Sequence, residues 1–141
     1  MKNIRFKNVC GTHVLVHTSD PPTDADWTEN MAGLVQRPSE LRGIFVYTMG
    51  GGPNAGQRSI YNVTLERLGM KPKVAVLSGS TVVRGIMTAF NWIQGGTMKL
   101  FSLGDLAPAC DYLGVSSLFE QRAIEAQVEV FKRELGIGMV R

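Results

Sequence analysis

A glycine-rich turn between an apolar strand and a helix restricts most strongly how this chain can fold. Residues 43–48, GIFVYT, are mostly β-branched or aromatic, which is typical of a strand covered on both faces. The glycines at 50–52 follow where the chain must reverse, and glycine carries no side-chain penalty there. A helical pattern then runs from Ala55 until Gly69 stops it. A second apolar strand at 73–78 completes a β-α-β unit, which predicts two parallel strands.

The helix of this unit has turn and helix-start residues before it and an apolar side. Pro53 and Asn54 are residue types that begin helices. We expect one broad face to pack on the sheet, and it contains these apolar residues: Ile60, Tyr61, Leu65 and Leu68.

The remaining chain alternates strands with helices. Residues 4–7 and 12–18 read as strands joined by the tight turn Cys10-Gly11-Thr12, which predicts an antiparallel hairpin at a sheet edge. Helices are predicted from the capping residue Thr23 to Pro38, at 81–94 and at 105–113, with a strand at 97–102. We therefore predict an α/β fold, with a mixed, mostly parallel five-stranded sheet and an N-terminal antiparallel hairpin.

A long helix is predicted at the end of the chain. Ser117-Leu118-Phe119-Glu120 matches a capping box. The following apolar residues have a spacing of four, three and four, so we expect them to be buried on the chain's own sheet or on a second copy: Ile124, Val128, Phe131 and Leu135. Packing on a second copy would make a homodimer. A homodimer could form through this helix or through an edge strand.

The net charge and the two cysteines exclude few classes of function. The 15 basic and 12 acidic residues give a net charge of +3, which is too small to predict nucleic-acid binding. The stretch between Glu66 and Asp105 has no acidic residue, and we interpret its lysines and arginines as solvated. Cys10 and Cys110 are expected to be two buried thiols. Because no leader or apolar run of membrane length appears, we expect a cytoplasmic protein without membrane contact.

No catalytic or cofactor motif is complete. The span from Gly51 to Gly56 resembles a phosphate-binding loop, but Gln57 and Arg58 follow where that motif needs Lys and Ser or Thr. His13 and His17 share a strand face, but they lie about 13 Å apart, too far for one metal ion. We therefore predict no enzyme activity, no cofactor and no metal. One alternative remains: a helix N-terminus behind a glycine loop can hold a small anion, with Arg58 and Ser59 assisting.

The layout resembles that of STAS domains, the fold of anti-sigma-factor antagonists, in its divergent STAS-like branch. The similar part covers about residues 1–116 of a single domain, 1–141, and residues 117–141 extend it. The stretch KVAVLSGSTVVRGIMTAFNWI followed by KLFSLGDLAPACDYLGV matches the late strand-helix-strand-helix pattern. Asp105 and Leu113-Gly114-Val115 stand where the family begins and closes its last helix.

The resemblance implies a non-catalytic regulatory module that binds a protein partner, such as an anti-sigma-type kinase or sensor. Family members bind that partner through the loop after the third strand and the next helix, and a serine at the helix start is phosphorylated. Ala55 stands in place of that serine, so Ser59 is the candidate phosphorylation site. The implied partner-binding residues are Met49, Gly50, Gly51, Gly52, Pro53, Asn54, Ala55, Gln57, Arg58 and Ser59. The other readings are the anion-binding protein or enzyme and an oligomeric scaffold through the final helix.

Overall fold

The computed structural model describes residues 2–79, 85 and 97–138. Within them, five strands form one sheet in the order β1-β2-β3-β4-β5. β1 is antiparallel to β2, and each later pair of neighbours is parallel. The predicted α/β class, with a mixed sheet and an N-terminal hairpin, is confirmed. The strands are β1 (Ile4–Val9), β2 (Thr12–His17), β3 (Gly43–Thr48), β4 (Val74–Leu77) and β5 (Met98–Phe101).

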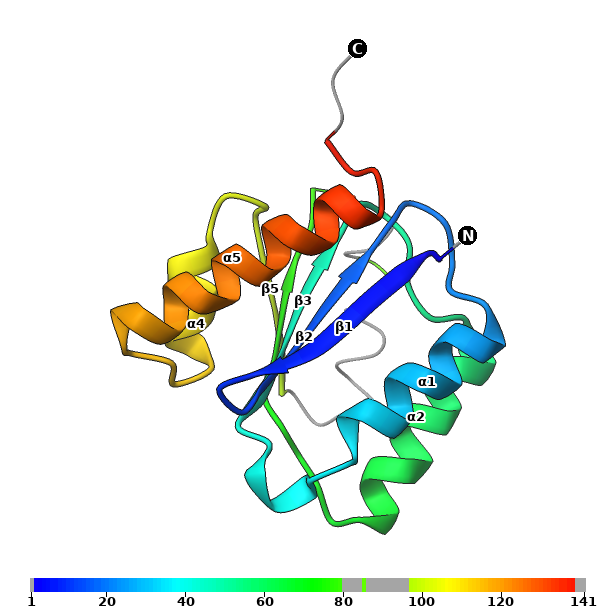
Figure 1. The fold of residues 1–141 in the computed structure, drawn as a ribbon. Helices are drawn as coiled ribbons and strands as arrows, with labels where there is room; N and C mark the ends of the chain where they lie inside the picture. Colours follow the sequence, from blue (N-terminus) through cyan, green and yellow to red (C-terminus); the bar gives the residue numbers. More distant parts are fainter. Residues whose placement is uncertain (1, 80–84, 86–96, 139–141) are drawn as a thin grey trace.

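Helices cover both faces of the sheet (Figure 1). The helix predicted at 81–94 lies, apart from residue 85, outside the part of the chain that the structure describes. One face packs against α1 and α2, and the other packs against α4 and α5. The helices are α1 (Asp24–Leu34), the 3-10 helix η1 (Pro38–Glu40), α2 (Ala55–Arg67), α4 (Leu106–Tyr112) and α5 (Leu118–Glu134).

The period of two along each strand divides the interior into two apolar layers. On β2, Leu15 faces α1 and α2, whereas Val14 and Val16 face α4 and α5. The first layer also holds Trp27, Met31, Leu34, Ile44, Tyr61, Leu65, Val74 and Val76. The second also holds Phe45, Ala75, Leu77, Cys110, Ile124, Val128 and Phe131. Of the predicted stripe of the final helix, Ile124, Val128 and Phe131 are thus buried on the chain's own sheet, and Leu135 is partly buried there.

The hairpin turn corrects one expectation. Val9 pairs with Thr12, so the turn consists of Cys10 and Gly11, whose φ angles are 53° and 91°. Positive φ at both positions suits the twist of a two-residue hairpin. The prediction of two buried thiols is right for Cys110 and wrong for Cys10, because a turn at the sheet end leaves Cys10 exposed.

Side chains fix the helix starts as the sequence indicates. The Thr23 hydroxyl accepts a hydrogen bond from the Asp26 N–H at 3.0 Å, and Ser117 caps α5 in the same way through Glu120. These caps satisfy donors that a helix N-terminus would otherwise leave unpaired.

Candidate functional site

The glycine loop, residues 49–54, follows β3 at the carboxyl end of the parallel strands and leads into α2. Open α/β sheets place their functional loops at this end. Its conformation is fixed by the segment after β2: the Met49 N–H donates to the carbonyl of His17 at 3.2 Å, and the Gly51 N–H donates to that of Thr18 at 2.9 Å. The loop therefore has one defined path along the β2–α1 connection.

Two glycines make this path possible. Gly50 has a φ of 130°, a conformation that side chains disfavour. At Gly51, an added Cβ would overlap the backbone oxygens of Thr18 and Asp20. The Thr48 hydroxyl closes the turn, accepting from the Gly50 N–H at 3.1 Å and donating to the Gly51 carbonyl at 2.5 Å. Because the N–H groups of Gly50 and Gly51 already have acceptors, they are not free to cradle a phosphate.

Gln57 is a structural residue of this site. Its side chain is buried and donates to the Pro22 carbonyl and to Asp24 Oδ1, both at 3.0 Å. Its Oε1 accepts from the Asn54 N–H, and the Gln57 N–H donates to Asn54 Oδ1, which makes a full capping box. The Gln57 carbonyl accepts from Trp27 Nε1 at 3.0 Å. Gln57 thus joins α2 to the start of α1 and presents no side chain to a partner.

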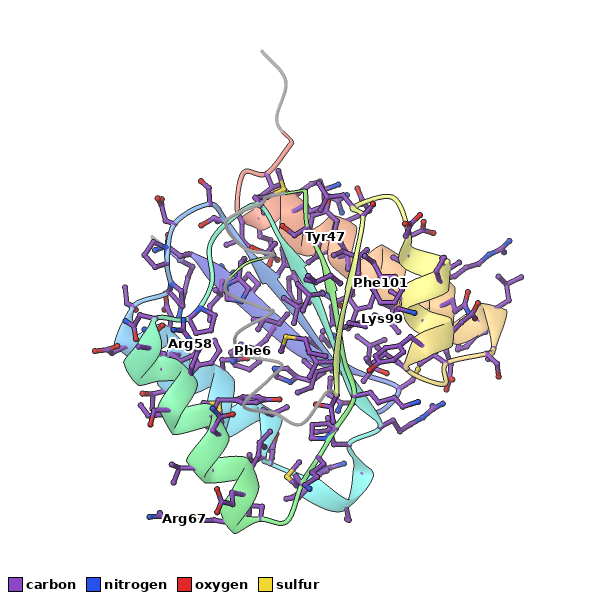
Figure 2. The ribbon with its side chains drawn as sticks, turned by 180° about the vertical axis from the view of Figure 1, so that it is seen from behind. Phe6, Tyr47, Arg58, Arg67, Lys99 and Phe101 are labelled. Atoms are coloured by element: carbon purple, nitrogen blue, oxygen red, sulfur yellow. The ribbon has the colours of Figure 1, made fainter. Side chains whose placement is uncertain are left out.

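Arg58 also serves the loop. It is half-buried, and its guanidinium donates to the Pro53 carbonyl at 2.7 Å. Figure 2 shows Arg58 near the loop end of α2 and Arg67 at the opposite end. Ala55 and Ser59 are exposed. The predicted partner-binding residues therefore divide by exposure. Gly51, Pro53 and Gln57 are buried, Gly50, Gly52 and Arg58 are half-buried, and the rest are open to solvent: Met49, Asn54, Ala55 and Ser59.

The outward side of α2 is apolar at its centre. Ile60 is 52% exposed and Val63 is 43% exposed. With Ser59 and Arg67 they follow the three- and four-residue spacing of one helix side, and we call these four residues the outer face of α2. The loop adds Met49, which is 40% exposed.

This arrangement corrects the predicted helix face. Tyr61 and Leu65 are buried as expected, but Ile60 and Leu68 are exposed. Successive helical residues turn by about 100°, so Ile60 points away from the sheet when Tyr61 points towards it. Leu68 lies beyond the last helical residue. The sequence contained a sign of this outer face: the apolar residues of the helix spread over a wider arc than one helix side can bury.

A cavity of about 50 Å³ lies beneath the loop, between the strands β2 to β5 and the helices α1 and α2. His13 and His17 both line it, and His13 Nε2 is 2.7 Å from Asn30 Oδ1. His17 Nδ1 has no hydrogen-bond partner among the described residues. Burial lowers the pKa of His17 to about 4 and also lowers the pKa of His13, against the raising effect of Asn30. Both rings are therefore neutral at pH 7. An apolar cavity of about 150 Å³ can hold benzene, and this cavity has about a third of that volume.

The described residues contain no group of three or more His, Cys, Asp or Glu side chains placed to hold a metal ion. Among the described helices, none is long and apolar enough to cross a membrane. Comparisons of the chain with models of protein families, with curated proteins and with solved structures found no match.

Proposed function

We propose that this chain is a non-catalytic, regulatory protein-binding module of STAS-like type, which contacts its partner through the outer face of α2 and the adjoining glycine loop. The observation that carries the proposal is the exposure of Ile60 and Val63 at the centre of that face. Apolar side chains favour removal from water, and interfaces commonly surround an apolar centre with Arg and other polar residues. Arg67 and Ser59 supply such a surround.

The inward side of α2 supports this role. Gln57 and Arg58 bind the loop and the start of α1, so the helix and loop hold one conformation before a partner arrives. A preformed surface loses little conformational freedom on binding, which improves affinity.

The alternatives have less support. The bound N–H groups of the glycine loop leave fewer donors for an anion. A scaffold built through the apolar stripe of α5 would need residues that are already buried in the chain's own core, such as Ile124 and Val128.

Phosphorylation would act differently here from the family pattern. Ala55 begins α2 and has no hydroxyl. Ser59 is exposed and belongs to the outer face, so a phosphate there would place negative charge beside Ile60 and disfavour an apolar contact. We propose that the module binds its partner constitutively unless Ser59 is modified. Stoichiometric phosphate at Ser59 in native protein, found by intact-mass analysis, would identify a switch.

The proposal is tested by binding measurements on matched variants. A partner is first captured with tagged protein from the native cell and then purified. We expect Ile60→Asp and Val63→Asp each to weaken its binding by at least about tenfold, which corresponds to about 1.4 kcal/mol. Phe119→Asp is the control, because Phe119 is 78% exposed on α5 and lies outside the proposed surface.

Equal binding by wild type and Ile60→Asp, or a loss confined to Phe119→Asp, would place the interface elsewhere. A substrate screen that found turnover abolished by one loop substitution would contradict the non-catalytic part of the proposal.

A further inference from the structure

A second surface lies at the opposite end of the sheet from the glycine loop and is independent of the proposed function. A groove of about 470 Å³ separates segments 38–42 and 69–73, near the amino ends of β3 and β4. Three cationic side chains line it, Arg42, Lys71 and Lys73, and no carboxylate does so among the described lining residues.

Aromatic rings extend this basic surface to the edge of the sheet. Lys73 Nζ lies 5.2 Å from the ring centroid of Tyr112, and Lys99 Nζ lies 5.7 Å from the same ring. Lys99 Nζ is also 5.4 Å from the ring of Phe101. Figure 2 shows Lys99 and Phe101 together on β5, on the side of α4. Both lysines are exposed, so the rings orient the side chains while the ammonium groups remain in water.

The charges on this surface are largely uncompensated. Arg42 is paired, since its guanidinium is 3.1 Å from Glu120 and also donates to the Cys10 carbonyl. Within residues 2–79 and 97–138, no ion pair to a carboxylate occurs at Lys71, Lys73 or Lys99. Like charges held near one another repel, and a ligand with several negative charges would relieve that repulsion.

We infer that this groove binds a compact polyanion carrying adjacent phosphoryl groups. Lysine is a phosphate-binding side chain. Two lysines line the groove, Lys71 and Lys73, and Lys99 lies over the same Tyr112 ring as Lys73, which suits two or more phosphoryl groups better than a single one. The volume is in the range of small-molecule sites. Single-stranded nucleic acid requires aromatic faces free to stack with bases, and here lysine ammonium groups lie over the rings of Tyr112 and Phe101. The ligand is therefore small and charged.

Isothermal titration of the full chain with sodium tripolyphosphate, at low and at physiological salt, tests this inference. We expect the double variant Lys73→Gln/Lys99→Gln to bind at least about tenfold more weakly than wild type, through loss of one cationic group in the groove and one beside it. The control Lys7→Gln/Arg133→Gln removes the same net charge from exposed positions on β1 and on α5, and should bind like wild type.

Three results would overturn the inference: no binding by wild type, equal binding by the two double variants, or a single-stranded oligonucleotide that binds more tightly with the same dependence on Lys73 and Lys99. Backbone amide NMR gives a second readout on wild type alone. Tripolyphosphate should shift resonances of segment 69–73, β5 and α4, and shifts confined to the glycine loop would contradict the proposed location.

Discussion

At the scale of single residues, His17 is a titratable side chain that the fold buries in the sheet. It is buried against Trp27, with ring centroids 6.4 Å apart, and its Nδ1 has no partner within the described chain. A protonated ring would be a buried charge without a counter-ion, and this is why the folded protein holds it neutral.

We predict that stability falls with acid because of this residue. The pKa is lowered from 6.5 to about 4 on folding, so the unfolded chain binds the proton more readily. The contribution of His17 to the free energy of unfolding is fully present above its unfolded pKa of 6.5. It declines as the pH falls below 6.5 and is lost below about pH 4. One pKa unit is worth about 1.4 kcal/mol, so the total loss from His17 is about 3 kcal/mol.

Urea unfolding at several pH values across this window measures the effect. His17→Leu keeps a similar volume and removes the titration, so its stability should depend less on pH. His13 still titrates in that variant, and a residual slope is expected. A variant with the full pH dependence of wild type would show that His17 is not responsible.

At the scale of elements, the glycine loop owes its shape to the β2–α1 connection. Gly51 runs so close to Thr18 and Asp20 that a methyl group would meet backbone atoms, which cannot rotate away as a side chain can. Gly52 is its neighbour, and a Cβ there meets nothing within 4 Å.

We predict that Gly51→Ala lowers the free energy of unfolding by about 1–3 kcal/mol, as overpacking does. Gly52→Ala should stay within about 0.5 kcal/mol of wild type. Chemical denaturation of the two variants makes the comparison. Equal stability would mean that the loop is not held against Thr18 and Asp20.

At the scale of the whole molecule, α5 closes one face of the sheet, and the chain needs it for a complete core. Phe131 is buried in the layer with Val14 and Ile124, while Phe119 on the same helix is exposed. The same substitution at these two positions therefore compares a residue that packs in the core with one that does not.

We predict that Phe131→Asp destabilises the fold by at least about 3 kcal/mol, since it removes a buried ring and buries a carboxylate. Phe119→Asp should be nearly neutral. Thermal unfolding should show a lower melting temperature for Phe131→Asp than for wild type. Light scattering should give the same molecular mass for the two proteins. An unchanged melting temperature with a halved mass would instead make the stripe an interface.

Much of the fold was predictable because local rules act over a few residues. Thr23, Asn54 and Ser117 cap their helices as the sequence indicates, since a capping side chain reaches only the next turn. The short link at Cys10 and Gly11 required an antiparallel hairpin, and the intervening helix required β3 and β4 to be parallel. Burial of Phe131 and its neighbours followed from their helical spacing.

Only the tertiary structure decided which side chains these elements present. Gln57 became a buried link because α1 brings Pro22 and Asp24 next to it, about 35 residues earlier in the chain. Ile60 became exposed because Tyr61 took the inward side of α2. Lys73 and Lys99 meet at the ring of Tyr112 because neighbouring strands and α4 converge there. Such contacts depend on distances between segments far apart in the chain, and residue spacing within one segment does not encode them.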